Sequence, residues 1–151
     1  MRAVVQRVNR ARVLVDGAAV GSIAQGLLVL AGATHDDSER DARALAEKIA
    51  GLRIFSDDEG QMNLSVTDIS GKVLVVSQFT VYGNVARGRR PSFTAAAAPN
   101  VAEPLIELVA RSLEDLGLVV SRGRFGAKME VELVNHGPVT ILLETRGGRL
   151  V

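Results

Sequence analysis

The sequence predicts an α+β fold: a mostly antiparallel, barrel-like curled sheet with about two packed helices in a single domain. Two observations support this fold class. Short β-type runs recur along the chain, and only two segments repeat apolar residues at helical spacing. The length of 151 residues suits one domain with a sizeable core, and no repeat or linker divides it, so we assign residues 1–151 to that domain.

The first 31 residues have the composition of strands. We predict strands at residues 3–8, 11–15, 19–23 and 27–31. Asp16-Gly17 is a strong hairpin signal between the second and third of them. The fourth is an apolar run, LLVLA, that glycines bracket, which is typical of a fully buried strand.

A helix is predicted after these strands. Asp36-Asp37-Ser38 marks its start, because acidic residues favour the first turn, and apolar residues then recur at helical spacing to about Gly51. Residues 53–55 are predicted as a short strand and residues 57–60 as an acidic turn. A second buried strand is predicted at residues 72–79.

The second half begins with an irregular segment, residues 83–100, which contains three arginines, two prolines and an alanine run. A loop of this length in a compact domain is usually functional or mobile. A second amphipathic helix is predicted at residues 102–116, closed by Gly117. Three more strands are predicted, at residues 118–121, 128–135 and 139–145.

Composition excludes several classes of function. The net charge is +1, which gives no overall signal for polyanion binding, and the chain has no cysteine, which removes disulfides, thiolate nucleophiles and Cys-ligated zinc. Charged residues among the first 25 exclude a signal-peptide core, and no apolar stretch could span a bilayer. We therefore expect a soluble, cytoplasmic protein with no membrane partner and no cofactor.

Two short segments interrupt the predicted β-structure with polar or conformationally special residues, a pattern that tends to mark functional sites. The first is Ser77-Gln78-Phe79-Thr80, whose backbone N–H groups could face a developing oxyanion. An ordinary strand end explains the same residues, and the residues alone favour that interpretation. The second is 135–140, where Gly137-Pro138 predicts either a cis peptide or, more simply, a tight turn between two strands.

Titratable and basic residues give weaker signals. His35 lies beside a helix start, and a lone histidine at a turn, such as His136, is more often exposed than a base. The acidic residues at 57–59 are more typical of a turn than of a cation site, and no spacing indicates a metal. Arg87, Arg89 and Arg90 cluster in a glycine-containing loop, which suits phosphate binding or simply a solvated surface.

Taken together, these residues resemble the D-aminoacyl-tRNA deacylase family. Its two signature segments are present as SQFT at 77–80 and NHGPVT at 135–140. The likeness covers nearly the whole chain, including RIFSDDEGQMNLSV at 53–66, RGRRPSF at 87–93 and GRFGAKMEVELVNHGPVT at 123–140. The departures are Val81, where leucine is common, and the tail after Thr145, to which we assign no role.

The resemblance implies an ester hydrolase that removes D-amino acids, and also mischarged glycine, from the 3′ end of tRNA. It implies a homodimer in which a cis Gly-Pro motif enters the partner's pocket and rejects L side chains, while backbone N–H groups and the 2′-OH of the RNA assist the chemistry. The implied residues are Ser77, Gln78, Phe79 and Thr80 for catalysis; Gly137, Pro138, Arg7, Phe125 and Met129 for substrate and chirality; and Arg87, Arg89 and Arg90 for tRNA.

Three alternatives stay open. Thr80 could act as a covalent nucleophile, although no activating residue is obvious nearby. An editor of L-amino acids from the same superfamily is a second alternative, which SQFT argues against. A non-catalytic RNA-binding module is the third, and it would need a broader basic face and more aromatic residues than the five present. The sequence leaves open the preferred D-amino acids and tRNAs, and any role of His136 or of residues 146–151.

Overall fold

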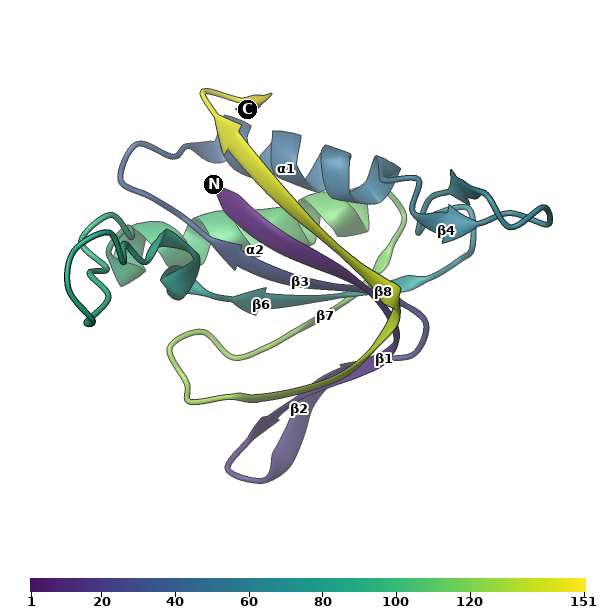
Figure 1. Cartoon of the computed structure of the whole chain (residues 1–151), viewed down its shortest axis with the longest axis horizontal. Helices are drawn as coiled ribbons and strands as arrows, with labels where there is room; N and C mark the ends of the chain where they lie inside the picture. The colour runs from purple at the N-terminus through teal and green to yellow at the C-terminus, as the bar shows by residue number, and fades with distance from the viewer.

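In the computed structural model, which describes residues 1–151, two α-helices cover one face of a strongly curled sheet (Figure 1). The elements in chain order are β1 (Arg2–Val15), β2 (Ala18–Ile23), β3 (Gly26–Gly32), α1 (Glu39–Gly51), β4 (Phe55–Ser56), β5 (Met62–Leu64), β6 (Lys72–Ser77), η1 (Phe79–Tyr82), α2 (Pro99–Asp115), β7 (Val119–Arg122), β8 (Glu130–Arg146) and β9 (Arg149–Leu150). The predicted α+β class, with two helices on a curled sheet, is confirmed.

The seven-stranded sheet is mixed. Its order is β7-β6-β3-β1-β8-β9, and β2 pairs with β1 beside this path. The four pairings that involve β1 or β8 are antiparallel, whereas β3 with β6 and β6 with β7 are parallel. Parallel neighbours need a long crossover, and α1 and α2 lie in the two connections that make these pairs.

Two strands are longer than predicted. The predicted strands at 3–8 and 11–15 are one strand, β1, and those at 128–135 and 139–145 are one strand, β8, which pairs with β1 on both sides of a register shift. The interpretation of Gly137-Pro138 as a tight turn between two strands is therefore wrong. The peptide bond between Gly137 and Pro138 is cis, and it lies where the continuous strand β8 bends (Figure 1).

The helix starts follow the expected chemistry. α1 begins after Ser38, whose N–H and hydroxyl both donate to the carboxylate of Asp41, at 2.9 and 2.8 Å. α2 begins at Pro99, three residues before the predicted start, because proline is well suited to a first helical position. The predicted strand at 72–79 ends at Ser77, and a 3₁₀ turn follows it.

Two apolar clusters lie on opposite faces of the sheet. Side chains alternate along a strand, so in β6 Val73 and Val75 join the larger cluster beneath the helices, whereas Leu74 and Val76 join a smaller cluster inside the curl. The smaller cluster lies on the face of the sheet that points away from the helices and joins residues of β1, β2, β3 and β6.

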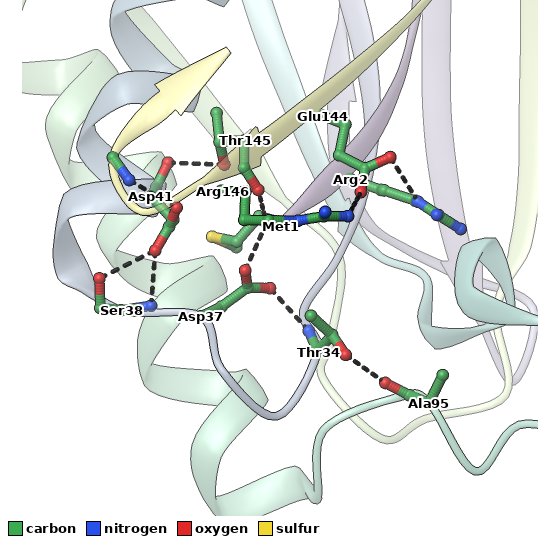
Figure 2. Close-up of polar contacts among 11 residues, drawn as sticks. Met1, Arg2, Thr34, Asp37, Ser38, Asp41, Ala95, Glu144, Thr145 and Arg146 are labelled. Atoms are coloured by element: carbon green, nitrogen blue, oxygen red, sulfur yellow. Dashed lines mark hydrogen bonds and ion pairs between the residues drawn. The ribbon is translucent and has the colours of Figure 1, made fainter. Parts of the chain in front are cut away.

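The start of β1 is held by a buried ion pair (Figure 2). Met1 is fully buried, and its ammonium donates to Oδ1 of Asp37 at 2.6 Å and to the carbonyl of Thr145 at 2.8 Å. The tail also contacts this region, because the N–H of Gly148 donates to Asp41 at 2.9 Å. Residues before α1, the start of β1 and the end of β8 are thus joined. Neither helix has the length and apolar character needed to cross a membrane.

We predict that Gly26→Ala is strongly destabilising. A Cβ at this position would lie 1.8 Å from the carbonyl oxygen of Lys72 on the neighbouring strand, which is backbone and cannot move aside. We expect a loss of more than about 2 kcal/mol in the free energy of unfolding, measured by denaturant titration. Gly51→Ala is the matched control: its Cβ would meet nothing within 4 Å, and it should stabilise α1 by about 0.5–1 kcal/mol. A Gly26→Ala chain as stable as this control would contradict the packing argument.

Candidate active site

The segment 77–80 lies where β6 ends, beside the end of β3. The N–H of Gln78 donates to the carbonyl of Ala31 at 2.7 Å, and the chain then turns into η1. The first N–H groups of a helical turn have no acceptor within it, which directs those of Phe79 and Thr80 away from the turn. Gly32 permits this close approach, because a Cβ there would lie 2.7 Å from the carbonyl oxygen of Gln78.

Thr80 has no base as a neighbour. Its hydroxyl accepts a hydrogen bond from the side-chain amide of Gln78. The Nε2 of His35 instead lies 2.8 Å from the carbonyl of Thr94, and His136 is exposed on β8 and contributes only its carbonyl to the hydrogen bonds. The arrangement therefore favours polarisation by backbone groups over attack by the threonine hydroxyl.

An apolar pocket of about 460 Å³ opens beside this turn. Phe79 forms one wall and meets Phe93 edge-to-face, with ring centroids 5.1 Å apart. Ser77 and Phe125 also line the pocket, as do the alanine run at 96–98 and the first turns of α2. Phe93 and the alanines were missed as pocket residues, because they lie in the segment predicted only as irregular.

Met129 lies outside this pocket. Its side chain packs against the smaller apolar cluster, and its Sδ accepts a hydrogen bond from the N–H of Arg124 at 3.4 Å. A Cβ on Gly123 would lie 2.8 Å from that sulfur. Met129 therefore packs against the apolar cluster on the inner face of the curled sheet.

The Gly137-Pro138 pair is exposed, and two side chains fix it from behind. The buried Arg7 donates through Nε to the carbonyl of His136 at 2.7 Å and through Nη1 to that of Ile54 at 2.6 Å. Asn135 accepts from the N–H of Val139 at 2.8 Å and donates to its carbonyl at 3.1 Å, which ties the two ends of the segment together. Arg7 thus braces the segment from β1.

Within one chain these two segments are far apart. On β3, Ala31 is the cross-strand partner of Ser77. Leu27, also on β3, is the partner of Arg7, which holds the Gly-Pro segment. Four residues of strand separate these two partners, or about 13 Å. The structure brings Phe125 to residues 77–80, but it leaves Gly137 and Pro138 at the other end of the sheet.

The arginine loop (residues 85–91) is a hairpin that a pair of backbone hydrogen bonds closes between Asn84 and Ser92, at 2.8 and 2.9 Å. Arg87, Arg89 and Arg90 are exposed in it and belong to none of the ion pairs. Arg122, in contrast, binds Glu107 and Glu114, and those two carboxylates raise its pKa. The loop therefore presents unneutralised positive charge.

The acidic turn is structural. Asp57 accepts hydrogen bonds from the side chain of Asn63 and from the N–H groups of Gln61 and Glu59, and these bonds hold the pKa of its carboxyl below the usual value. No group of three or more His, Asp or Glu side chains in residues 1–151 is arranged so that it could hold a metal ion.

Comparison with known proteins decides the family. The family model described as D-Tyr-tRNA(Tyr) deacylase matches residues 4–144. The chain belongs to the D-aminoacyl-tRNA deacylase family. A D-aminoacyl-tRNA deacylase from Heliobacterium modesticaldum is 57% identical over 98% of this chain and 99% of its own length. One from Roseiflexus sp. (strain RS-1) is 59% identical over 96% of this chain and 94% of its own length.

Two solved structures share the fold of this chain. The structure titled c-Myc DNA Unwinding Element Binding Protein superposes with a TM-score of 0.91 at 38% identity, over 97% of this chain and 100% of that one. A probable eukaryotic D-amino acid tRNA deacylase has a TM-score of 0.81 at 17% identity, over 95% of this chain and 98% of that one, which shows a common fold.

We predict that Arg7→Gln destabilises the deacylase fold by about 2 kcal/mol or more, because it leaves the carbonyls of His136 and Ile54 without their donor, and each unsatisfied buried acceptor costs about 1–3 kcal/mol. Arg10→Gln is the matched control, since Arg10 is exposed on the same strand and should change stability by less than about 0.5 kcal/mol. Equal unfolding midpoints for the two variants would show that Arg7 does not brace the segment.

Proposed function

We propose that the chain removes D-amino acids from tRNA with an oxyanion site at residues 77–80 and a chirality filter at Gly137-Pro138. The activity itself follows from the family: the chain is a D-aminoacyl-tRNA deacylase, a hydrolase whose substrate is D-aminoacyl-tRNA. The observation that supports the proposal is the 3₁₀ turn after Ser77, whose first N–H groups have no acceptor within the turn and which borders an apolar pocket without a charged side chain.

Hydrolysis at this turn would proceed through backbone polarisation. The ester carbonyl lies against the N–H groups of Phe79 and Thr80, which stabilise the negative charge that develops when water attacks. Gln78 holds the Thr80 hydroxyl, and the apolar walls strengthen these interactions by lowering the local dielectric. The reaction breaks the ester bond and releases the D-amino acid and free tRNA.

The 2′-OH of the terminal ribose assists in activating the water. We assign this role to the RNA because neither histidine of the chain makes a hydrogen bond to residues 77–80. Thr80 as a covalent nucleophile is the less favoured mechanism, since its hydroxyl accepts a hydrogen bond from an amide and has no base beside it.

The filter needs a second copy of the chain, because residues 137–138 and 77–80 lie at opposite ends of one sheet. Between them runs an open strip of residues that face away from the helices: Val4, Leu30 and Leu142 in one cross-strand row, with Gln6 and Thr140 in the next. Leu142 is 78% exposed at the centre of this strip. Exposed apolar side chains of this kind mark association surfaces.

Symmetry then completes the site. If the open strips of two copies pack face to face about a two-fold axis that runs across the strands, each end of one strip meets the opposite end of the other. The Gly-Pro segment of one copy thereby reaches residues 77–80 of its partner. We propose this homodimer as the functional unit.

Chirality is then selected by exclusion. The carbonyl groups of Gly137 and Pro138 face the amino group of the substrate, and an L side chain collides with this backbone wall, whereas a D side chain points elsewhere. Glycine has no side chain to collide, so mischarged glycyl-tRNA is also hydrolysed. The arginine loop binds phosphates of the tRNA through Arg87, Arg89 and Arg90.

The direct test compares matched substrates. We expect the purified protein to hydrolyse D-tyrosyl-tRNA and glycyl-tRNA and to leave L-tyrosyl-tRNA intact, as followed by release of labelled amino acid. Equal rates on D- and L-tyrosyl-tRNA would refute the filter, and hydrolysis of the L substrate alone would refute the activity.

A complementation experiment tests the shared site. Gly137→Ala should crowd the partner's pocket and tilt the carbonyls, which lowers turnover of D-tyrosyl-tRNA, because Gly137 has a φ of +145° and its Cβ would lie 2.9 Å from the N–H nitrogen of Val139. Gly32→Ala should displace the turn, because its Cβ would lie 2.6 Å from a methyl group of Val81. Each variant alone should have little activity. An equal mixture, exchanged through dissociation, should recover about a quarter of wild-type activity, since half the dimers are mixed and each has one intact site. No recovery from two folded variants would place the filter and the turn in one chain.

A further inference from the structure

A pocket of about 790 Å³ lies at the start of β1 and the end of β8. It is separate from the candidate active site. Figure 2 shows much of its wall, with Arg2 and Glu144 on one side and Thr34, Asp37 and Ala95 on the other. The volume is in the range of small-molecule and nucleotide sites. Neither the mechanism above nor the packing of the core uses it.

Tyr82 faces this pocket with an unused hydroxyl. The side chain is 93% buried, being 7% exposed, and its hydroxyl makes no hydrogen bond within the chain. The one polar side-chain atom that is sealed from solvent without a partner is the hydroxyl of Ser112, so the hydroxyl of Tyr82 is open to the pocket. Burial raises its pKa well above the usual value, which keeps the phenol protonated as a hydrogen-bond donor.

The other polar groups of the wall fall into two sets. Asp37 is committed to the Met1 ammonium and to the N–H of Thr34, and Glu144 is committed to Arg2 and Arg146 (Figure 2). The carboxylate of Asp36 and the amide NH₂ of Asn84 make no hydrogen bond within the chain. Together with the Tyr82 hydroxyl they give donors and an acceptor in a pocket whose charges are nearly balanced.

Such a lining suits a nucleobase. Bases present mixed donors and acceptors at their edges and stack on guanidinium planes, and the guanidinium of Arg2 lies 4.7 Å from the centre of the Tyr82 ring. Phosphate, in contrast, would find no uncommitted cluster of cations here. The balanced charge therefore favours the base over the backbone of a nucleic acid.

The position of the pocket indicates which nucleotide. Tyr82 is the last residue of η1, the turn that begins at the proposed oxyanion site, and Asn84, Val85 and Ala86 belong both to the pocket wall and to the first part of the arginine hairpin. An RNA strand that ends at residues 77–80 and has its phosphates on Arg87–Arg90 would pass this pocket.

We propose that the pocket receives the base of an unpaired nucleotide that precedes the terminal nucleoside of the tRNA 3′ end, with the Tyr82 hydroxyl as a donor to it. This inference rests on the proposed function, because it takes the ester end of the tRNA to lie at residues 77–80. It makes Tyr82 a residue that binds the substrate at a distance from the reacting ester.

The test is Tyr82→Phe, which removes only the hydroxyl, assayed on two substrates. One is D-tyrosyl-tRNA, and the other is D-tyrosyl-adenosine, which lacks every nucleotide before the last. We expect KM for D-tyrosyl-tRNA to rise about threefold to tenfold with kcat unchanged, the effect of one lost hydrogen bond, and both constants to be unchanged for D-tyrosyl-adenosine. Thr67→Val, which removes an exposed hydroxyl in the loop before β6, is the matched control. It should leave KM and kcat unchanged for both substrates.

The outcomes are separable. An equal effect of Tyr82→Phe on both substrates would mean that the hydroxyl supports the turn η1 and not the RNA, and no effect on either would mean that the pocket stays filled with water; both overturn the proposal. If the wild-type protein hydrolyses neither substrate, the proposed function itself fails.

Discussion

The pairing of β1 with β8 is the constraint on which the other features depend. β1 pairs with both halves of β8, from Arg2 opposite Glu144 to Leu14 opposite Glu130, and the register shifts only around Val8. Those shifts are where β8 bends and where Gly137-Pro138 projects, so the ladder sets both the place and the exposure of that segment. Because β1 also pairs with β3, and β3 with β6, the same ladder fixes how far the segment lies from residues 77–80.

Local signals predicted the elements of this fold but not their connections. Ser38, Asp16-Gly17 and the apolar run of β3 each act over a few residues, and the structure has the expected cap, turn and buried strand there. The fusion of two predicted strands into β8 depends on a partner more than 100 residues away, which no local pattern contains. The parallel pairing of β6 with β3 and β7 could not be predicted either. A buried apolar strand looks the same in sequence whether its neighbours run parallel or antiparallel to it.

The candidate site was predictable to a similar extent. Its motif residues interrupt β-structure and could therefore be picked out from the sequence as candidates, whereas the hydrogen bonds of Arg7 to His136 and Ile54 could not. The rest of the pocket could not, because Phe93 and the alanine run carry no motif of their own and become a wall only when the loop folds over Phe79. Met129 shows the opposite case: a residue near the motif in sequence packs on the far face of the sheet.

A filter made of backbone atoms, as proposed for Gly137-Pro138, would select by shape, so its selectivity would depend on the rigidity of the segment. Asn135 closes the segment on both sides through Val139, and Arg7 holds the carbonyl of His136 with a guanidinium that has no carboxylate partner. Burying that cation is costly, and hydrogen bonds from a charged donor, at about 1.5–3 kcal/mol each, offset part of the cost. None of these contacts involves a second copy of the chain. The contacts that shape the segment therefore lie within one chain, and in the proposed dimer assembly has only to place the segment against the partner's turn.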